Sequence, residues 1–188
     1  VSVEFDDDLQ FKDSYLKGSR IMFENMISGK LNYGSKPSHV MYMEPDCIPV
    51  RPFWLDAIIA QINPPQEHFW VKGSVFRGDY NALREPSSTF QVAHINGNAI
   101  YNIGDGKFYE LYKTQIRPFI VANNTESAYD QDIIKYLLWN GHRGSMNYWH
   151  LYKSTNLIQN KWHSFYSLSE LLADNNETFL VHGGIQNP

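Results

Sequence analysis

The sequence predicts an α/β fold, because strand-like and helix-like segments alternate along the chain. Apolar residues between positions 9 and 28 recur at helical spacing, with Tyr15, Met22 and Met26 on one stripe and Leu16, Phe23 and Ile27 beside it. The apolar run at 39–43 follows a turn-rich connector and ends at two acidic residues, which is typical of a buried strand. These patterns predict an apolar sheet with amphipathic helices packed on it.

Further elements are predicted in chain order from the same signals. Residues 1–5 alternate apolar and polar as a short strand does, and Gly29 provides a C-terminal stop for the helix at 9–28. A short helix is expected at 53–62, because Pro64 and Pro65 close that segment. Bulky apolar and β-branched residues predict two more strands, at 69–76 and 89–93.

The second half of the chain is predicted to be helix-rich. A helix is expected at 107–114 after a glycine turn, and another at 129–140, preceded by the capping-type residues Thr125 and Ser127. The last predicted elements are a strand at 147–152, a helix at 167–173 and a strand at 178–181.

Bulk properties limit the function classes. A length of 188 residues fits one domain, residues 1–188, with a substantial core. The net charge of −4 and the absence of a Lys/Arg run argue against a nucleic-acid partner. The single cysteine, Cys47, indicates a reducing compartment, and no apolar run reaches the roughly 18 residues of a membrane span. A soluble, cytoplasmic protein is therefore expected.

Glu44-Pro45-Asp46 is the most informative motif. In extended chain, residues i and i+2 share a face, so both carboxylates point the same way at the exit of the strand at 39–43. Mg²⁺ and Mn²⁺ commonly bind through one or two carboxylates together with substrate phosphates. The motif predicts a metal-diphosphate site, and the alternative is an acidic strand end that only turns in solvent.

A second candidate ligand lies near the C-terminus of the sequence. The strand at 178–181 delivers His182 into Gly183 and Gly184. A neutral imidazole there can complete a metal site, and glycines let a backbone approach a diphosphate closely. The alternative is an ordinary loop histidine.

Three further groups are candidates for substrate chemistry. Asp130 and Asp132 lie in the first turn of a predicted helix. Either they only cap the helix, or one of them acts as a base on an acceptor hydroxyl. The segment from His94 to Asn98 is either a tight turn or an uncharged array for sugar hydroxyls. That array would use His94, Asn96, Gly97 and Asn98. Candidate phosphate contacts are Lys17, Arg20, Lys72 and Arg77.

At these residues the chain resembles GT-A nucleotide-sugar glycosyltransferases. The resemblance runs from Lys17-Gly18-Ser19-Arg20 through Glu44-Pro45-Asp46 to Trp54-Leu55-Asp56, and more weakly to the end of the chain. The nearest likeness is to small domains with an EPDC-type motif, found in plant and large algal virus proteins. The resemblance implies an α/β/α sandwich with a central mixed, mostly parallel sheet.

The resemblance also implies an activity and a set of site residues. In the family, the acidic DxD motif binds Mn²⁺ or Mg²⁺ that bridges the donor's phosphates. Carried over, Asp46 is a metal ligand, Glu44 a ligand or a donor contact, and His182 a further ligand. Asp130 or Asp132 corresponds to the base of inverting members. A UDP-sugar donor and a glycan or glycoprotein acceptor are implied, in the host cytoplasm for a viral member.

The chain departs from the family in two ways. The motif begins with Glu rather than Asp, and only 43 residues precede Glu44, so the expected domain is shortened or incomplete near its N-terminus. Three alternatives stay open. They are a retaining enzyme of the same fold, a non-catalytic carbohydrate-binding protein with structural Ca²⁺, and a sugar nucleotidyltransferase, although the last usually needs a glycine-rich basic loop.

Overall fold

The computed structural model describes residues 15–31, 34–35, 37–63, 67–82, 89–125, 127–139 and 145–186. The strand predicted at 1–5 lies outside these residues, as does the start of the helix predicted at 9–28. The described helices are α1 (Tyr15–Ile27), α2 (Trp54–Ala60), η2 (Tyr80–Ala82), α3 (Thr89–Ala93), α4 (Gly106–Leu111), η3 (Tyr112–Ile116), α5 (Arg117–Ala122), α6 (Tyr129–Trp139), η4 (Ser145–Leu151) and α7 (Leu168–Asp174).

The described strands form two main sheets and one small one. Their bounds are β1 (His39–Tyr42), β2 (Cys47–Pro49), β3 (Val71–Gly73), β4 (Ala99–Asn102), β5 (Tyr152–Ser154), β6 (Ile158–Asn160), β7 (Phe165–Tyr166), β8 (Leu180–His182) and β9 (Ile185–Gln186). The larger sheet has the order β1-β4-β3-β5, the second β2-β8-β6, and the third pairs β7 with β9.

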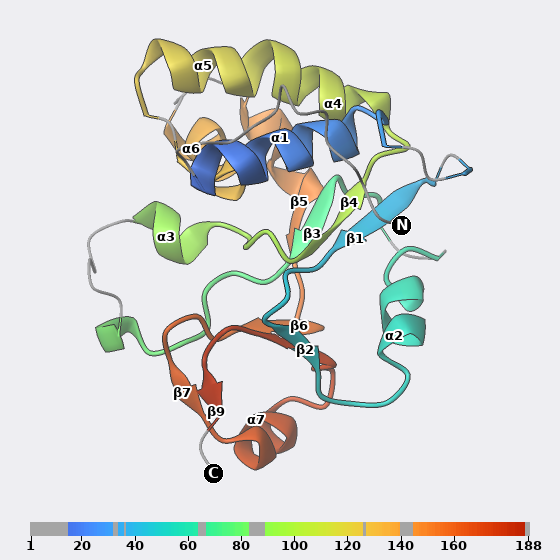
Figure 1. Ribbon diagram of the computed structural model, residues 1–188, viewed down its shortest axis with the longest axis vertical. Coiled ribbons are helices and arrows are strands. Elements are labelled where there is room, and N and C mark those ends of the chain that lie inside the picture. The colour runs from blue at the N-terminus through green and yellow to red at the C-terminus, as the bar shows by residue number, and fades with distance from the viewer. Residues whose placement is uncertain are drawn as a thin grey trace.

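Strand β4 is the centre of the larger sheet, and its side chains divide the core. All four of its residues are buried. Tyr101 packs with Phe23 of α1 and Phe108 of α4, whereas Ile100 packs on the other face with Ile58 of α2 and Leu180 of β8. This alternation follows from the two-residue period of a strand. Figure 1 shows α1, α4, α5 and α6 gathered on one side of the sheet, with the second sheet and α7 at the opposite end of the molecule.

Several predicted elements are confirmed. Gly29 has a φ of +71° just after α1, as a C-terminal stop requires. The helices predicted at 53–62, 129–140 and 167–173 appear as α2, α6 and α7, and Ser167 caps α7 through its side chain. The α/β class is therefore correct. The helix predicted at 107–114 starts as α4 and continues through a π-helical turn, η3, into α5.

Two predicted strands are wrong. Residues 89–93 form the short helix α3, whose turn is extended by hydrogen bonds from the backbone N–H and the ring Nδ1 of His94 to the Phe90 carbonyl. Residues 147–151 belong to the 3₁₀ helix η4, and only Tyr152 enters a strand. Tyr148 stacks on Trp70 at 5.1 Å, so tertiary packing overrides the strand propensity of these aromatic residues.

The sheet also differs from the mostly parallel arrangement expected. In the larger described sheet, β4 is antiparallel to both β1 and β3, and only β3 and β5 are parallel. The strand β4 was not predicted, because its residues follow the polar run from His94 to Asn98, which favours a turn. On α1, Met22 and Leu16 are exposed rather than part of the buried stripe, which consists of Phe23, Met26 and Ile27.

None of the helices in the described ranges is both long and apolar enough to cross a membrane.

Candidate metal centre

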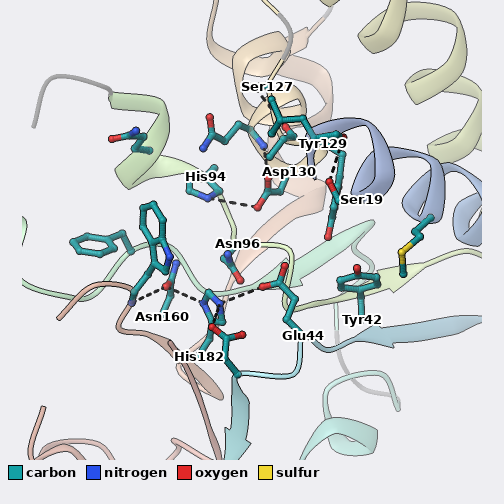
Figure 2. Close-up of a pocket in the computed structure, with 18 of the residues that line it drawn as sticks. Ser19, Tyr42, Glu44, His94, Asn96, Ser127, Tyr129, Asp130, Asn160 and His182 are labelled. Carbon is teal, nitrogen blue, oxygen red and sulfur yellow. Dashed lines mark hydrogen bonds and ion pairs between the residues drawn. The ribbon is translucent and has the colours of Figure 1, made fainter. Parts of the chain in front are cut away.

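A pocket of about 860 Å³ is lined by several of the site residues that the sequence predicts, among them Glu44, Asp46, Asp130 and His182. Its walls come from α1, the exit of β1, α3 with the loop after it, the start of α6, and the exits of β6 and β8. Figure 2 shows Glu44 and His182 on one side of this pocket and Asp130 and His94 on the other. The pocket therefore places acidic and imidazole groups across from each other.

Strand register explains why Glu44, Asp46 and His182 meet although they are far apart in sequence. Strand β8 runs antiparallel to β2, so His182 at the end of β8 pairs with Cys47 at the start of β2. Asp46 directly precedes Cys47, and its carbonyl accepts a hydrogen bond of 3.2 Å from the backbone N–H of Gly183. The register thus brings the strand exits together at one point.

The three side chains form a compact group of possible ligands. The Nε2 atom of His182 lies 3.2 Å from a Glu44 oxygen and 3.4 Å from an Asp46 oxygen. Within the described part of the chain, this is the group of carboxylate and imidazole donors whose atoms all lie within 4.8 Å of one another. The side chain of His182 is 4% exposed and that of Asp46 is 58% exposed, so the group is anchored on one side and open on the other.

Glu44 is held in place by the amide of Asn98. The Asn98 Nδ2 donates to Glu44 Oε2 at 2.8 Å, and its Oδ1 accepts from the Glu44 backbone N–H at 2.6 Å. This contact arises because the end of β1 pairs with the start of β4, Tyr42 opposite Ala99. A hydrogen bond from His182 lowers the pKa of Glu44; burial opposes that effect, and the charge of His182 and the Asn98 amide reinforce it. Glu44 is therefore a fixed carboxylate.

His182 is oriented by Asn160, which is 2% exposed. The Asn160 Oδ1 lies 3.1 Å from His182 Nδ1 and also accepts the backbone N–H of Trp162 at 3.2 Å. An amide oxygen can only accept hydrogen bonds, so His182 Nδ1 is the donor in its contact with Asn160 Oδ1 and carries a proton. The Nε2 atom faces the two carboxylates, and a cation bound there would replace the proton that Nε2 donates to Glu44.

These residues fit a hard divalent cation. Two carboxylates and one imidazole are ligands that Mn²⁺ accepts, and Mg²⁺ binds through carboxylates with water and phosphate completing its shell. Donors about 2.1 Å from an octahedral ion lie about 3 Å apart, close to the separations of 3.2 and 3.4 Å seen here. The exposed Asp46 leaves room for phosphate oxygens. Glu44, Asp46 and His182 are therefore suited to hold the predicted ion.

The opposite wall of the pocket is built around Asp130. Its carboxylate accepts the backbone N–H of Gly97 at 2.9 Å and that of Gln131 at 2.9 Å. His94 Nε2 lies 3.5 Å from Asp130 Oδ2, while Nδ1 of the same ring contacts the Phe90 carbonyl at 2.9 Å. Burial raises the pKa of Asp130, and the charge of His94 and the two N–H groups counteract the rise. A buried carboxylate with a raised pKa that lines a pocket is suited to proton transfer.

Asp132 has a different environment, which separates it from Asp130. It is fully buried and does not line the pocket. Its carboxylate accepts from the Ser127 backbone N–H and hydroxyl and lies 3.5 Å from Arg20 and 3.3 Å from Arg117. Ser127 therefore donates to the helix carboxylate instead of capping the helix with its own oxygen. Asp132 holds the start of α6 in place.

The other predicted contact residues divide into two groups. His94 and Asn96 line the pocket as expected. Asn98 is fully buried and, with Gly97 and Gly183, lies outside the pocket lining. These three hold the site from behind: a Cβ on Gly97 would lie 2.3 Å from the Tyr129 hydroxyl, and Gly183 has a φ of +59°. A side chain would therefore be crowded at Gly97 and conformationally strained at Gly183.

No lysine or arginine lines the pocket among the residues that the structure describes. Lys17 is not part of the lining, and Arg20 is buried, donating to the Ser127 carbonyl at 2.7 Å beside Asp132. Lys72 and Arg77 are likewise outside the lining. Within the described residues, the pocket walls thus carry carboxylates without a compensating Lys or Arg, and a bound cation would supply positive charge for an anionic ligand.

The sequence did not indicate Asn160, Trp162, Tyr42 or Gln91 as site residues, yet all four line the pocket. Asn160 offered a weak signal, because it is a polar residue shortly after the apolar pair Leu157-Ile158. Its role depends on β6 lying parallel to β8, with Asn160 beside His182, and that pairing has no local sequence signature.

No family model, curated protein or solved structure matches the chain. The arrangement of the pocket is therefore the basis on which a function is argued.

Proposed function

We propose that this protein is a metal-dependent glycosyltransferase of the GT-A type, which transfers a sugar from a UDP-sugar to a glycan hydroxyl with inversion. The observation that carries the proposal is the pocket itself. Two carboxylates and an imidazole converge on one wall, and a buried carboxylate with a raised pKa faces them from the other. An inverting, metal-dependent nucleotide-sugar transferase needs both groups within one cavity.

The first group would hold Mn²⁺ or Mg²⁺. Bound to Glu44, Asp46 and His182, the cation supplies the positive charge that binds the two phosphates and stabilises the departing UDP. The lining described above has no Lys or Arg that could take over this role. The proposal therefore requires donor binding to depend on the metal.

The second group supplies the base. Asp130 accepts the proton of the acceptor hydroxyl as its oxygen attacks the anomeric carbon, and the bond from that carbon to the phosphate oxygen breaks with its electron pair leaving on UDP. The N–H groups of Gly97 and Gln131 fix the carboxylate, and His94 stands beside it. Asp130 rather than Asp132 is assigned this role, because only Asp130 lines the pocket.

The test uses the purified full chain with Mn²⁺ and a panel of UDP-sugars, and measures the UDP that is released. Asp46→Ala is expected to lower Mn²⁺-dependent UDP release by at least about 100-fold. The reason is that it removes one of the three proposed ligands, and even residues behind metal ligands affect metal affinity 10- to 100-fold. Asp46 is 58% exposed, so its loss should leave folding intact. The matched control is Asp56→Ala, which removes another exposed carboxylate outside the pocket.

Unchanged UDP release by Asp46→Ala would contradict the proposal. A protein that binds glycans but has no affinity for UDP with Mn²⁺ would instead be the carbohydrate-binding alternative. Calorimetry with UDP, with and without Mn²⁺, distinguishes these two cases.

A further inference from the structure

Trp162 lines the pocket and lies on a turn that is hydrogen-bonded to β8, the strand that ends at His182. Its side chain is 42% exposed, although it lines the pocket. The turn closes through a hydrogen bond of 2.8 Å from the Ser164 N–H to the Lys161 carbonyl, and the Lys161 N–H donates to the His182 carbonyl at 2.9 Å. The Trp162 N–H donates to Asn160 Oδ1, the same atom that contacts the ring of His182.

The turn is held in a conformation that its sequence does not favour. His163 has a φ of +58°, a region that side chains other than glycine seldom adopt, at a cost on the order of 1 kcal/mol. Behind the turn, Gly183 packs so closely that a Cβ there would lie 3.1 Å from Trp162 Cα. The rings of Trp162 and His163 lie 4.0 Å apart. A large aromatic surface is thus fixed beside the pocket but is not buried in the core.

Polar and apolar side chains line the same pocket as Trp162. Asn160, whose Oδ1 accepts the Trp162 N–H, and Gln91 carry amide groups, and Phe76 adds apolar surface. In Figure 2, Asn160 lies beside His182, and the Asp130–His94 pair lies across the pocket from them. Trp162, whose N–H binds the same Asn160 oxygen, therefore lies on the side of the candidate metal ligands.

We propose that Trp162 is a stacking platform for a neutral pyranose ring bound in the pocket. A sugar ring has an apolar face of C–H groups, which an exposed indole covers, and hydroxyls at its rim, which neighbouring amides bind. The stacking itself depends only on Trp162 and its neighbours.

The direct test measures sugar binding without requiring catalysis. Methyl glycosides of glucose, galactose, mannose, xylose and rhamnose are titrated at millimolar concentration into the full chain with Mn²⁺ and UDP, and saturation-transfer NMR reports bound ring protons. At least one glycoside is expected to bind the wild type, with about a 10-fold or greater loss in Trp162→Ala and substantial retention in Trp162→Phe. Trp149→Ala is the matched control, since that indole is 41% exposed and lies outside the pocket.

Each outcome decides the proposal. If none of the glycosides binds the wild type, or Trp162→Ala binds as the wild type does, the platform is refuted. A larger loss of UDP affinity than of glycoside affinity in Trp162→Ala means that the indole stacks on the nucleobase, and this also overturns the proposal. If the wild type binds glycosides through Trp162 but does not bind UDP with Mn²⁺, the sugar platform stands and the proposed transferase function fails.

Discussion

At the scale of single residues, Asn160 shows how one buried amide organises two parts of the site. Its Oδ1 accepts the Trp162 N–H and contacts His182 Nδ1, so the same oxygen holds the turn and orients the imidazole. Residues behind metal ligands typically affect metal affinity 10- to 100-fold, because they fix the tautomer and direction of the ligand. Asn160 is therefore a positioning residue rather than a ligand.

Asn160→Ala is expected to weaken Mn²⁺ binding by about 10- to 100-fold, because His182 loses its orienting partner. Isothermal calorimetry with Mn²⁺ measures this change. The control is Gln159→Ala on the same strand. The Gln159 side chain donates to Thr178 Oγ1 at 3.2 Å and makes no hydrogen bond with Glu44, Asp46 or His182 among those of the described residues.

A structural role alone would lower the melting temperature of both variants and leave their Mn²⁺ affinities equal. That result would remove Asn160 from the metal centre. The expected result is a difference in affinity between the two variants.

At the scale of elements, the loop between α3 and β4 determines how the two pocket walls are spaced. Its His94 end faces Asp130, its Gly97 N–H binds the same carboxylate, and its Asn98 end binds Glu44. Asn96 connects these contacts, since its Oδ1 accepts from both the backbone N–H and the Nδ2 of Asn98. One short loop therefore links the proposed base to the proposed metal ligands.

Gly97→Ala is expected to destabilise the protein by about 1 to 3 kcal/mol, because overpacking has that cost in a tight site. The added Cβ would lie 2.3 Å from the Tyr129 hydroxyl. Denaturant unfolding of the two proteins measures the change in the free energy of unfolding.

Gly106→Ala is the matched control for this substitution. At Gly106 a Cβ would meet nothing within 4 Å, and the residue begins α4. The control is expected to be neutral or more stable by up to about 1 kcal/mol. Equal unfolding free energies for the two alanine variants would show that the close contact at Gly97 does not affect the stability of the protein.

At the scale of the whole molecule, the candidate centre lies where the two main sheets join. Glu44 follows β1 of the larger sheet, whereas Asp46 precedes β2 and His182 ends β8 of the second sheet. An ion bound to all three residues would tie the sheets together. Because such binding requires the folded arrangement, it stabilises the native state by mass action.

Mn²⁺ at 100 times its dissociation constant is expected to stabilise the wild type by about 2.7 kcal/mol. Thermal unfolding in Mn²⁺ and after removal of metal with EDTA measures this effect, and Asp46→Ala should abolish it. UDP is expected to raise the melting temperature further only when Mn²⁺ is present. UDP stabilisation that persists in EDTA would place the diphosphate elsewhere than on this centre.

The local pattern of the sequence determined the features that depend on neighbouring residues. Helical spacing and the terminating glycine predicted α1, and a short helix was expected at 167–173, where α7 lies. The Glu-Pro-Asp motif after an apolar run predicted the acidic pair at a strand exit. Backbone propensity, capping and side-chain periodicity act over a few residues, so they can be read without the fold.

Other features were decided only by the tertiary structure. The pairing of β6 with β8 sets Asn160 beside His182, and the packing of α6 separates a pocket carboxylate, Asp130, from a buried one, Asp132. Residues 89–93 form a helix that contacts α6, despite their strand propensity. Strand pairing and burial depend on contacts between distant segments, so the sequence determined which residues were available, and the fold determined which of them face one another.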